Sequence, residues 1–428
     1  MSVDVLVVGS GAREHALAWK LKQSPRIGKL YVAPGNGGTL NIAENVPIEA
    51  MDFQKLATFA EERKIGLTIV GPDEPLGAGI VDVFNSCGLR IFGPSKEAAQ
   101  IESSKAFAKT LMREAKVPTA EFAIFSNPSV ALAHVRLRGV PIVIKASGLA
   151  LGKGVYVCRT MGEAERAITE IMVLKVHKDS GNEVVIEEYL DGQEISIHAL
   201  SDGITHILFP ASQDHKPALD GDMGKNTGGM GTIAPVPWVT TEMTASFESQ
   251  VVVRTLEALK KRGIQYKGLL YPGLKTLLNG PKVLEFNARF GDPETQVYAR
   301  LLKSDLLDII EACVDGTLSA VGSSVEWNRG FAANVVMVSG GYPDSYEKGF
   351  PITGIEEAEK MEGVVVFHAG TRIENGQLVT AGGRVLSVSA VGDTLKQALD
   401  RAYKSVDKIH FEGMHFRRDI GAKALSSE

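Results

Sequence analysis

The sequence predicts a multidomain protein of the α/β and α+β classes, which begins with a doubly wound parallel sheet and ends with a small α+β domain. At 428 residues, the chain exceeds what one hydrophobic core usually organises. Its first hundred residues alternate short, continuous apolar runs with helical patterns, which is typical of a buried parallel sheet. After Trp327 the pattern changes to strands separated by glycine-rich turns, with one late helix at residues 394–405.

Four strands are expected in the N-terminal part, and each is followed by a turn-forming cluster. The strands are residues 3–8, 29–32, 67–70 and 90–92, and the helices between them are residues 13–22, 53–64 and 76–86. Because ligands bind beyond the carboxyl ends of parallel strands, the loops that follow these strands should converge on one site.

A compact unit at residues 122–190 is expected in the middle of the chain. A helix precedes it, opened by Ser103-Ser104-Lys105 and continuing to about Ala115. In order, the unit contains a strand, a helix, a strand at 141–146, a glycine loop, a strand at 155–158, a second helix and a strand at 184–188. A long polar loop is expected farther on, at residues 213–231, and such loops are more often functional than decorative.

Charge and cysteine content limit the partners and the compartment. The formal net charge is −5 and basic residues form no long run, so nothing indicates a nucleic-acid or membrane-surface partner. No segment approaches the ~18 uninterrupted apolar residues of a membrane span. The three cysteines, Cys87, Cys158 and Cys313, are far apart, which fits a reducing compartment. We therefore expect a soluble, cytoplasmic protein.

The first glycine loop, Gly9-Ser10-Gly11-Ala12-Arg13-Glu14, has part of a dinucleotide-binding pattern. Glu14 stands where the third glycine is needed for helix–strand packing, and the second strand ends in Ala33-Pro34-Gly35-Asn36 instead of a ribose-binding acid. NAD binding is therefore disfavoured. Two interpretations are left: a phosphate held at a helix N-terminus, or a tight turn without a ligand.

The second glycine loop runs from Lys145 to Gly154. Its glycine spacing is one residue short of a P-loop, and Gly154 replaces the Ser or Thr that would bind magnesium. Because a strand follows, we expect a glycine-rich hairpin whose N–H groups fold over a triphosphate, with Lys145 as a fixed cation. An ordinary β-hairpin is the alternative.

Three polar clusters complete the candidate site. In the segment 284–294, strand alternation places Glu285, Asn287 and Arg289 on one face, where two oxygen donors and a guanidinium suit a metal-bound phosphate. A surface ion-pair strand would be the alternative, but it would give the asparagine no role. The acids at 187–194 and the segment around His215 are weaker signals on their own.

These clusters, in this order, resemble the glycinamide ribonucleotide synthetase family, also called phosphoribosylamine–glycine ligases, within the ATP-grasp superfamily. The resemblance covers essentially the whole chain. Its matching segments are residues 9–17, 33–36, 92–95, 226–231, 289–296, 340–343, 368–371 and 381–386. Two positions depart from the family pattern: Ala12 replaces a glycine, and Ser147 replaces an aspartate.

The resemblance implies four structural parts. These are an N-terminal substrate-binding domain at 1–102, a central ATP-grasp domain at 103–121 and 191–325, a mobile lid domain at 122–190, and a C-terminal α+β domain at 326–428. The implied reaction is ATP + glycine + 5-phosphoribosylamine → ADP + phosphate + glycinamide ribonucleotide, in purine biosynthesis. Glycine would be activated as an acyl phosphate, which needs Mg²⁺ or Mn²⁺, Lys and Arg to offset the meeting of anions. We expect a monomer without nucleic-acid or membrane partners.

The resemblance also implies roles for single residues. The ATP-binding residues would be Lys105, Lys145, Ser147, Gly148, Gly152, Lys153, Gly154, Glu187, Leu190 and Glu194. Glu285 and Asn287 would hold the metal, although the preceding strand lacks the further acid of many ATP-grasp enzymes. Catalysis would involve Arg289 and Asp292, and the substrates would contact Gly11, Asn36, Pro72, Asp214 and His215.

Three other functions stay open at this point: a dehydrogenase using the N-terminal sheet, another ATP-grasp ligase or carboxylase, and a catalytically silent nucleotide-binding module.

Overall fold

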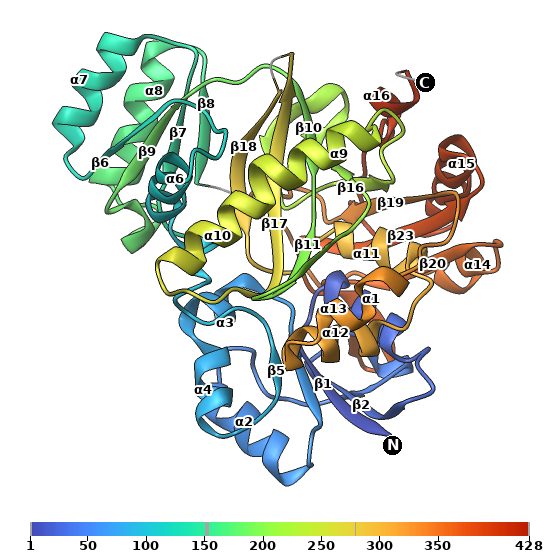
Figure 1. Cartoon of the computed structure of the whole chain (residues 1–428). Helices are drawn as coiled ribbons and strands as arrows, with labels where there is room; N and C mark the ends of the chain where they lie inside the picture. Colours follow the sequence, from blue (N-terminus) through green and yellow to red (C-terminus); the bar gives the residue numbers. More distant parts are fainter. Residues whose placement is uncertain (1, 150–153, 279, 427–428) are drawn as a thin grey trace.

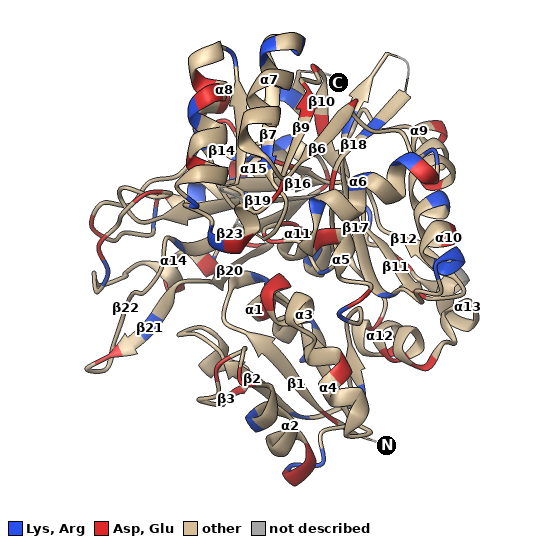
Figure 2. Cartoon of the chain, turned by 90° about the vertical axis from the view of Figure 1, so that its left-hand side faces the viewer, with Lys and Arg blue, Asp and Glu red and all other residues tan. Residues whose placement is uncertain are grey.

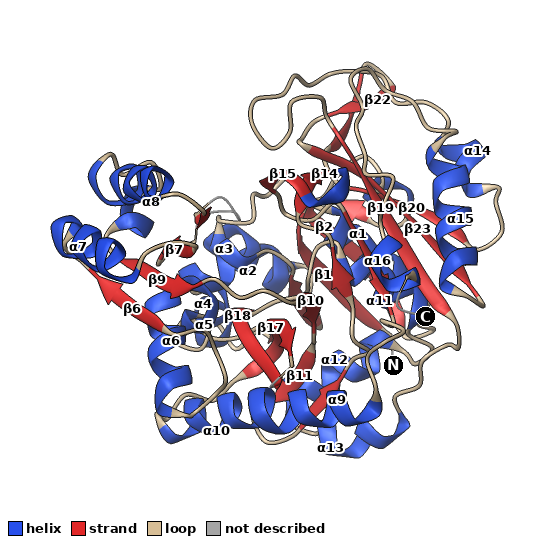
Figure 3. Cartoon of the chain, turned by 90° about the horizontal axis from the view of Figure 1, so that it is seen from above, coloured by secondary structure: helices blue, strands red, loops and turns tan. Residues whose placement is uncertain are grey.

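The computed structural model describes residues 2–149, 154–278 and 280–426. Figure 1 shows the N-terminal domain below, the central β-structure above it, the unit from β6 (Phe122–Phe125) to β9 (Val184–Glu188) at the upper left and the C-terminal domain at the right. Viewed from above in Figure 3, the central strands lie between the unit around β6–β9 and the C-terminal sheet. Within the described ranges, no helix has both the length and the hydropathy needed to cross a bilayer.

The N-terminal domain is a five-stranded parallel sheet in the order β3-β2-β1-β4-β5. Its elements are β1 (Val3–Gly9), α1 (Ala12–Leu21), β2 (Ile27–Pro34), β3 (Glu44–Asn45), α2 (Phe53–Glu62), β4 (Leu67–Val70), α3 (Asp73–Ala78), α4 (Ile80–Ser86) and β5 (Ile91–Phe92). Successive β1 residues pack on opposite faces, and both faces are covered. The predicted parallel sheet is confirmed. The single helix expected at 76–86 is wrong, because Gly79 adopts φ +100° and separates α3 from α4.

Residues 122–190 form a four-stranded antiparallel sheet in the order β6-β9-β7-β8. Its elements are β6 (Phe122–Phe125), α7 (Pro128–Arg138), β7 (Ile142–Ala146), β8 (Val155–Cys158), α8 (Met161–Ile168) and β9 (Val184–Glu188). Ile144 and Ile186 pack against the two helices. Alternation turns Lys145 and Glu187 to the opposite face, where the candidate site lies. The expected hairpin is confirmed by the antiparallel pairing of β7 with β8.

The central domain has a second antiparallel sheet, in the order β10-β17-β11-β12, with β18 also paired to β17. Its elements are α5 (Gln100–Ser103), α6 (Lys105–Glu114), β10 (Gln193–Ser196), β11 (Ala199–Asp202), β12 (His206–Leu208), α9 (Thr241–Phe247), α10 (Arg254–Lys261), β17 (Lys267–Leu277) and β18 (Gly280–Asn287). Ser104 caps α6 by accepting a hydrogen bond from Phe107 N at 3.2 Å. The helix that begins at this cap, with Lys105 in its first turn, packs against β9 and β18.

The C-terminal sheet recruits two strands from earlier in the chain. Its order is β13-β16-β19-β23-β20, with α11 and α15 packed against it. These elements are β13 (Gln213–Asp214), β16 (Gly231–Ala234), α11 (Glu294–Leu301), β19 (Phe331–Val338), β20 (Val364–His368), β23 (Arg384–Gly392) and α15 (Leu395–Val406). The remaining elements are β14 (Pro217–Leu219), β15 (Met223–Asn226), α12 (Leu306–Asp315), α13 (Leu318–Val321), α14 (Ile355–Glu359), β21 (Thr371–Glu374), β22 (Gln377–Thr380) and α16 (Ala422–Leu425). The long loop expected at 213–231 is wrong, because β14 and β15 form a hairpin inside it.

Basic and acidic positions are interspersed along the helices of the molecule (Figure 2). Several of the resulting ion pairs join the N-terminal domain to α12 of the central domain. Arg26 contacts Glu311, and Arg90 contacts Asp315, both at 2.7 Å. Such partly exposed pairs add little stability individually, so the buried apolar cluster that they flank is the main contact between these domains.

Candidate active site

A cavity of about 1050 Å³ opens where the domains meet. Its wall includes the N-terminal loops at Gly11 and Pro72, α6 at Lys105, β18 at Glu285, and the C-terminal domain at Arg384. Segments from across the whole chain therefore supply its lining. This convergence agrees with the expectation that loops at the carboxyl edge of the N-terminal sheet bound a site.

On the N-terminal wall, the Glu14 carboxylate contacts the Gly11 amide at the start of α1, the kind of backbone group that can hold a phosphate. Its Oε2 accepts a hydrogen bond from Gly11 N at 2.5 Å, and its Oε1 accepts one from Arg13 Nε at 2.6 Å. A Cβ atom on Gly71 would lie 1.9 Å from Glu14 Oε1, so the glycine there makes room for this carboxylate. The Gly11 amide is consequently engaged by the protein, which the glycine pattern alone did not reveal.

Asn36 is buried and lies outside the residues that line the cavity. Its Nδ2 donates to Ser10 O at 2.9 Å and to His368 O at 2.8 Å. Asn36 thus ties the first glycine loop to the C-terminal domain, whereas Gly11 and Pro72 border the cavity directly.

The two expected phosphate-binding lysines lie on neighbouring elements. Lys145 Nζ is 3.1 Å from Glu187 Oε2 and donates to Leu284 O at 2.9 Å. Lys105 Nζ donates to Gly148 O at 3.3 Å. Both lysines border the cavity, where burial lowers the pKa of Lys105. A fixed pair of cations at this wall suits a polyphosphate.

Glu187 is shared by two lysines, one of which the sequence interpretation missed. Lys109 Nζ and Lys145 Nζ both lie 3.1 Å from Glu187 Oε2. Burial lowers the pKa of Lys109 to about 8, against the attraction of Glu187. Glu187 Oε1 is buried and has no hydrogen-bond partner in the part of the chain that the structure describes. A ligand donor would satisfy this oxygen.

The glycine loop is joined to α6 through its first residues. Ser147 Oγ accepts a hydrogen bond from Ala106 N at 3.1 Å, and Gly148 N donates to Ser180 O at 3.2 Å. Gly154 borders the cavity, as do Leu190 and Glu194. Gly152 and Lys153 were expected to bind ATP and lie outside the described residues.

Glu285 and Asn287 face the cavity from β18, and each already contacts a cation of the protein. Glu285 Oε1 lies 2.9 Å from Lys216 Nζ, and Asn287 Oδ1 accepts a hydrogen bond from Arg289 at 3.1 Å. Lys216 above all, with help from Lys145 and Lys105, holds the pKa of Glu285 well below its usual range despite burial. Glu285 is therefore an ionised carboxylate.

These two donors fit a hard divalent cation. An ionised carboxylate and an amide oxygen are ligand types that Mg²⁺ accepts. In the described ranges, no group of three or more His, Cys, Asp or Glu residues could hold a metal ion. Glu285 and Asn287 alone would leave positions around such a cation for phosphate oxygens and water.

Arg289 is held from several sides but keeps one nitrogen free. Its guanidinium lies 3.3 Å from Glu102 and donates to Phe290 O at 3.2 Å, in addition to its contact with Asn287. Nε is buried and has no hydrogen-bond partner among the described residues. Burial opposes the charge of Arg289, but Glu102 and Asp73 keep its pKa above the usual range. A permanently charged donor thus lines the cavity without a complete set of partners.

A second polar cluster contains Asp214, Asp292 and Glu294. Burial, and then Glu294, raise the pKa of Asp214 well above its usual range. Asp214 Oδ1 has no hydrogen-bond partner within the described ranges, and a Cβ atom on Gly229 would lie 2.6 Å from it. Asp292 pairs with Arg384 at 3.1 Å, so the C-terminal domain contributes a cation that the sequence interpretation missed.

His215 also borders the cavity, but the protein engages both of its ring nitrogens. Nε2 accepts a hydrogen bond from Gly421 N at 3.0 Å, and Nδ1 lies 3.2 Å from Gly231 O. Burial lowers its pKa to about 4, so the ring is neutral near pH 7. His215 therefore connects the wall of the cavity to the C-terminal segment.

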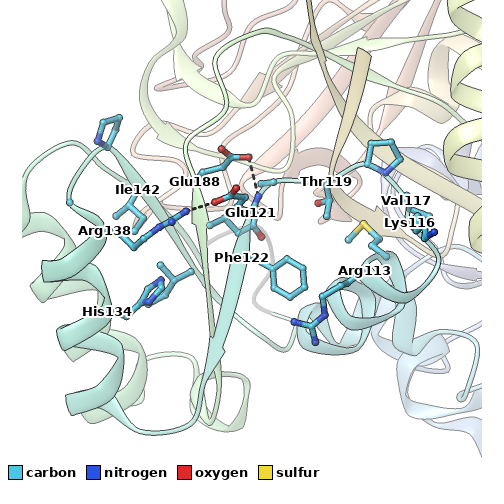
Figure 4. Close-up of a pocket in the computed structure, with 17 residues that line it drawn as sticks. Arg113, Lys116, Val117, Thr119, Glu121, Phe122, His134, Arg138, Ile142 and Glu188 are labelled. Atoms are coloured by element: carbon cyan, nitrogen blue, oxygen red, sulfur yellow. Dashed lines mark hydrogen bonds and ion pairs between the residues drawn. The ribbon is translucent and has the colours of Figure 1, made fainter. Parts of the chain in front are cut away.

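A smaller cavity of about 680 Å³ lies beside the connection between α6 and β6 (Figure 4). Figure 4 shows Phe122 between Arg113 on one side and His134 on the other. Among the described residues expected at the site, only Glu187 borders this cavity. The converging cations and acids instead surround the larger cavity.

The fold and the larger cavity together define an ATP-grasp protein. Residues 103–295 match the model of the phosphoribosylglycinamide synthetase ATP-grasp (A) domain, residues 3–102 match the N domain of that synthetase, and residues 332–423 match its C domain. The chain belongs to the phosphoribosylglycinamide synthetase family.

Individual relatives match this chain over nearly its whole length. The chain is 49% identical to the phosphoribosylamine–glycine ligase of Rhodopirellula baltica over 428 residues, which covers 99% of this chain and 98% of that protein. It is 46% identical to the human trifunctional purine biosynthetic protein adenosine-3, covering 100% of this chain but 42% of the longer protein. The crystal structure of the ligase from Thermotoga maritima matches with a TM-score of 0.85 and 34% identity, covering 98% of this chain and 100% of that one.

The biotin carboxylase domain of Hydrogenobacter thermophilus 2-oxoglutarate carboxylase shares the fold. Its TM-score is 0.73, at 17% identity, with 97% of this chain and 92% of that chain covered. Its low identity makes this a likeness of fold alone.

Proposed function

We propose that the chain is a phosphoribosylamine–glycine ligase, EC 6.3.4.13, which joins glycine to 5-phosphoribosylamine and converts ATP to ADP and phosphate. The observation that carries the proposal is one cavity that brings Lys105, Lys145, Glu285 and Arg289 to the N-terminal loops around Gly11. Family membership over the whole chain supports the choice of substrates. Purine biosynthesis in the cytoplasm, by a monomer, is the setting that we propose.

ATP would bind between the sheet of β6–β9 and β18. Lys105 and Lys145 would contact its phosphates, and Leu190 and Glu194 would border the nucleoside. The free Oε1 of Glu187 would accept a hydrogen bond from a donor on the base, which would remove the cost of a buried, unpaired oxygen. The glycine loop from Ser147 to Gly154 would cover the phosphates of the bound ATP.

Glu285 and Asn287 would hold Mg²⁺ or Mn²⁺. When bound, the ion would offset charge on the β- and γ-phosphate oxygens. The residues of the chain perform the rest of the activation: they orient the glycine carboxylate and offset the charge that develops near Arg289. Its unpartnered Nε is suited to an oxygen of the transferring phosphoryl group or of the acyl phosphate.

Glycine would be oriented through its ammonium group. Asp214 offers a buried oxygen without a partner, and Glu294 lies close enough to raise the pKa of Asp214. A cationic ligand would offset the cost of burying these carboxylates and would reduce the repulsion between them. Gly229 leaves room for the Asp214 carboxylate, because any Cβ there would lie 2.6 Å from Asp214 Oδ1.

Phosphoribosylamine would approach from the N-terminal wall at Gly11 and Pro72. Asp292 is close to that wall, because a Cβ on Gly11 would lie 3.3 Å from its Oδ2. Burial alone would raise the pKa of Asp292, but the pKa is lowered overall, by Arg384 first and then by Arg13, so Asp292 is ionised near pH 7. An ionised carboxylate at this position could take the proton that the amine loses when it attacks the acyl phosphate.

The test is ADP release with ATP and Mg²⁺, with glycine and freshly prepared phosphoribosylamine supplied singly and together. We expect full turnover only with both. Equal ADP release with either acceptor omitted would contradict the ligase assignment. Bicarbonate-dependent release that is indifferent to glycine would indicate a carboxylase, and reduction of NAD would indicate a dehydrogenase.

A further inference from the structure

Lys216 forms an ion pair with Glu285 at the wall of the larger cavity. The distance between Lys216 Nζ and Glu285 Oε1 is 2.9 Å, and both side chains are about one quarter exposed, at 27% and 28%. Both border the larger cavity. Lys216 immediately precedes β14, and its carbonyl oxygen accepts a hydrogen bond from Thr227 N at 2.9 Å. The backbone is therefore anchored while the side chain reaches into the cavity.

We propose that Lys216 is a further catalytic residue, whose ammonium neutralises Glu285 in the empty site and contacts the transferring phosphoryl group once Glu285 binds a divalent cation. This inference rests on the proposed function, because it assumes that Glu285 is a metal ligand and that a phosphoryl group passes to glycine.

The charges around Glu285 explain why Lys216 neutralises it in the empty site. Glu285 is an acid on a strand that faces three lysines, of which only Lys216 contacts its carboxylate directly. A divalent cation on the same carboxylate would repel an ammonium about 3–4 Å away. Glu285 would therefore bind the ammonium more weakly once the metal ion is bound. The flexible four-carbon stem of lysine lets its charged end move while the backbone stays in place.

The surroundings of Glu285 indicate where the Lys216 ammonium would go when a metal ion displaces it. Lys105 and Lys145 lie on the cavity wall near Glu285, and their charges contribute to the low pKa of that carboxylate. This is where the phosphates of ATP are assigned. Glu194 and Asp214 also attract the Lys216 ammonium, but a triphosphate carries more negative charge than either acid. The ammonium released from Glu285 would therefore turn to the phosphate oxygens.

In the phosphoryl-transfer step, a carboxylate oxygen of glycine forms a bond to Pγ while the bond from Pγ to the β,γ-bridging oxygen breaks. The electron pair of the broken bond leaves with ADP. Lys216 forms no covalent bond and keeps its proton. Its ammonium offsets the negative charge on the equatorial oxygens of the phosphoryl group, which is where positively charged groups accelerate such reactions.

The first experiment measures Mn²⁺ binding to the nucleotide-free protein by electron paramagnetic resonance. Lys216→Gln should bind Mn²⁺ about tenfold more tightly than the wild type, because the competing ammonium is gone. Lys275→Gln is the matched control: Lys275 also borders the cavity, but it pairs with Glu194 at 3.2 Å. The control should change Mn²⁺ affinity by less than about threefold, since its charge does not contact the ligand.

The second experiment measures steady-state ligation at saturating substrates. Lys216→Gln should lower kcat by about 10²-fold, as for loss of one charge that stabilises a transition state, while the KM for ATP changes little. Lys216→Arg should restore part of kcat, because it restores the positive charge.

Either of two results would overturn the inference. One is equal Mn²⁺ affinity, or no measurable binding, in both the wild type and Lys216→Gln. The other is tighter Mn²⁺ binding with unchanged kcat, which would make Lys216 only the counter-ion of the empty site. Failure of the proposed function looks different: the wild type itself would show no glycine-dependent ADP release, and the catalytic role of Lys216 would fall with it.

Discussion

Replacing Glu102 by glutamine should change how the stability of the protein depends on pH. Glu102 lies on α5 with a side chain that is 9% exposed. One carboxylate oxygen is 3.3 Å from the Arg289 guanidinium, and the other accepts a hydrogen bond from Ala288 N at 2.7 Å. Burial is the largest influence on this group, and it raises the pKa of Glu102 to about 7 although Arg289 opposes the rise.

The sign of the effect follows from proton binding. Between the ordinary pKa of 4.5 and about 7, folded protein holds a proton on Glu102 that unfolded protein releases. Stability from this group is therefore greatest below pH 4.5, falls as pH rises through this window, and is level above it. The difference between the two pKa values corresponds to a change of about 3 kcal/mol, which is an upper limit. Glutamine cannot ionise, so Glu102→Gln lacks this slope.

The measurement is the free energy of unfolding in urea at pH 5 and pH 8, for the wild type and the variant. The stability of Glu102→Gln relative to the wild type should increase by up to about 3 kcal/mol from the lower to the higher pH. Glu114→Gln, which changes an exposed acid of α6, serves as the control for a general effect of charge. A stability difference between Glu102→Gln and wild type that is constant from pH 5 to pH 8 would show that Glu102 does not titrate with a raised pKa in the folded protein.

Three further predictions concern the cavity. Glu285→Ala should lower kcat by ~10³-fold, because the phosphoryl group loses a charge clamp, and near-wild-type activity at saturating Mg²⁺ would place the metal elsewhere. Gly229→Ala should lower kcat/KM for glycine by roughly tenfold or more, because Gly229 has φ +114° and a Cβ there would lie 2.4 Å from Pro293 Cδ. An unchanged kcat/KM would show that the neighbouring Asp214 does not bind glycine. Hydrogen exchange at residues 145–149 should slow when ATP binds, as expected for a mobile lid, and equal protection with and without ATP would contradict it.

Local signals explain the parts of the fold that the sequence predicted well. The strands expected at 67–70, 155–158 and 184–188 match β4, β8 and β9 in full. Short apolar runs bounded by turn residues can be recognised as strands without knowledge of distant contacts. The start of α6 was likewise marked by the capping residue Ser104. The family could also be identified from ordered motifs, because each motif is contiguous in the chain.

Contacts between distant segments could not be inferred in the same way. The sequence interpretation treated 213–231 as one loop, yet β13 and β16 pair within the C-terminal sheet and β14 and β15 form a hairpin. The strands β13, β14 and β15 are short and have little hydrophobic periodicity, and β16 pairs with β19, which lies far along the chain. The motif around His215 likewise did not show that the ring nitrogens are satisfied by Gly231 and Gly421.

The N-terminal parallel sheet, the hairpin after Lys145, the family, and the residue types available to bind phosphate and metal can all be read from the amino-acid sequence. Which charges meet is known only from the folded chain: Lys216 pairs with Glu285, and Arg384 with Asp292, across separations of 69 and 92 residues. The physical reason is that apolar periodicity and turn chemistry act over a few neighbouring residues. Ion pairs in a cavity depend instead on the packing of whole domains, which brings together side chains whose spacing in the chain carries no signal.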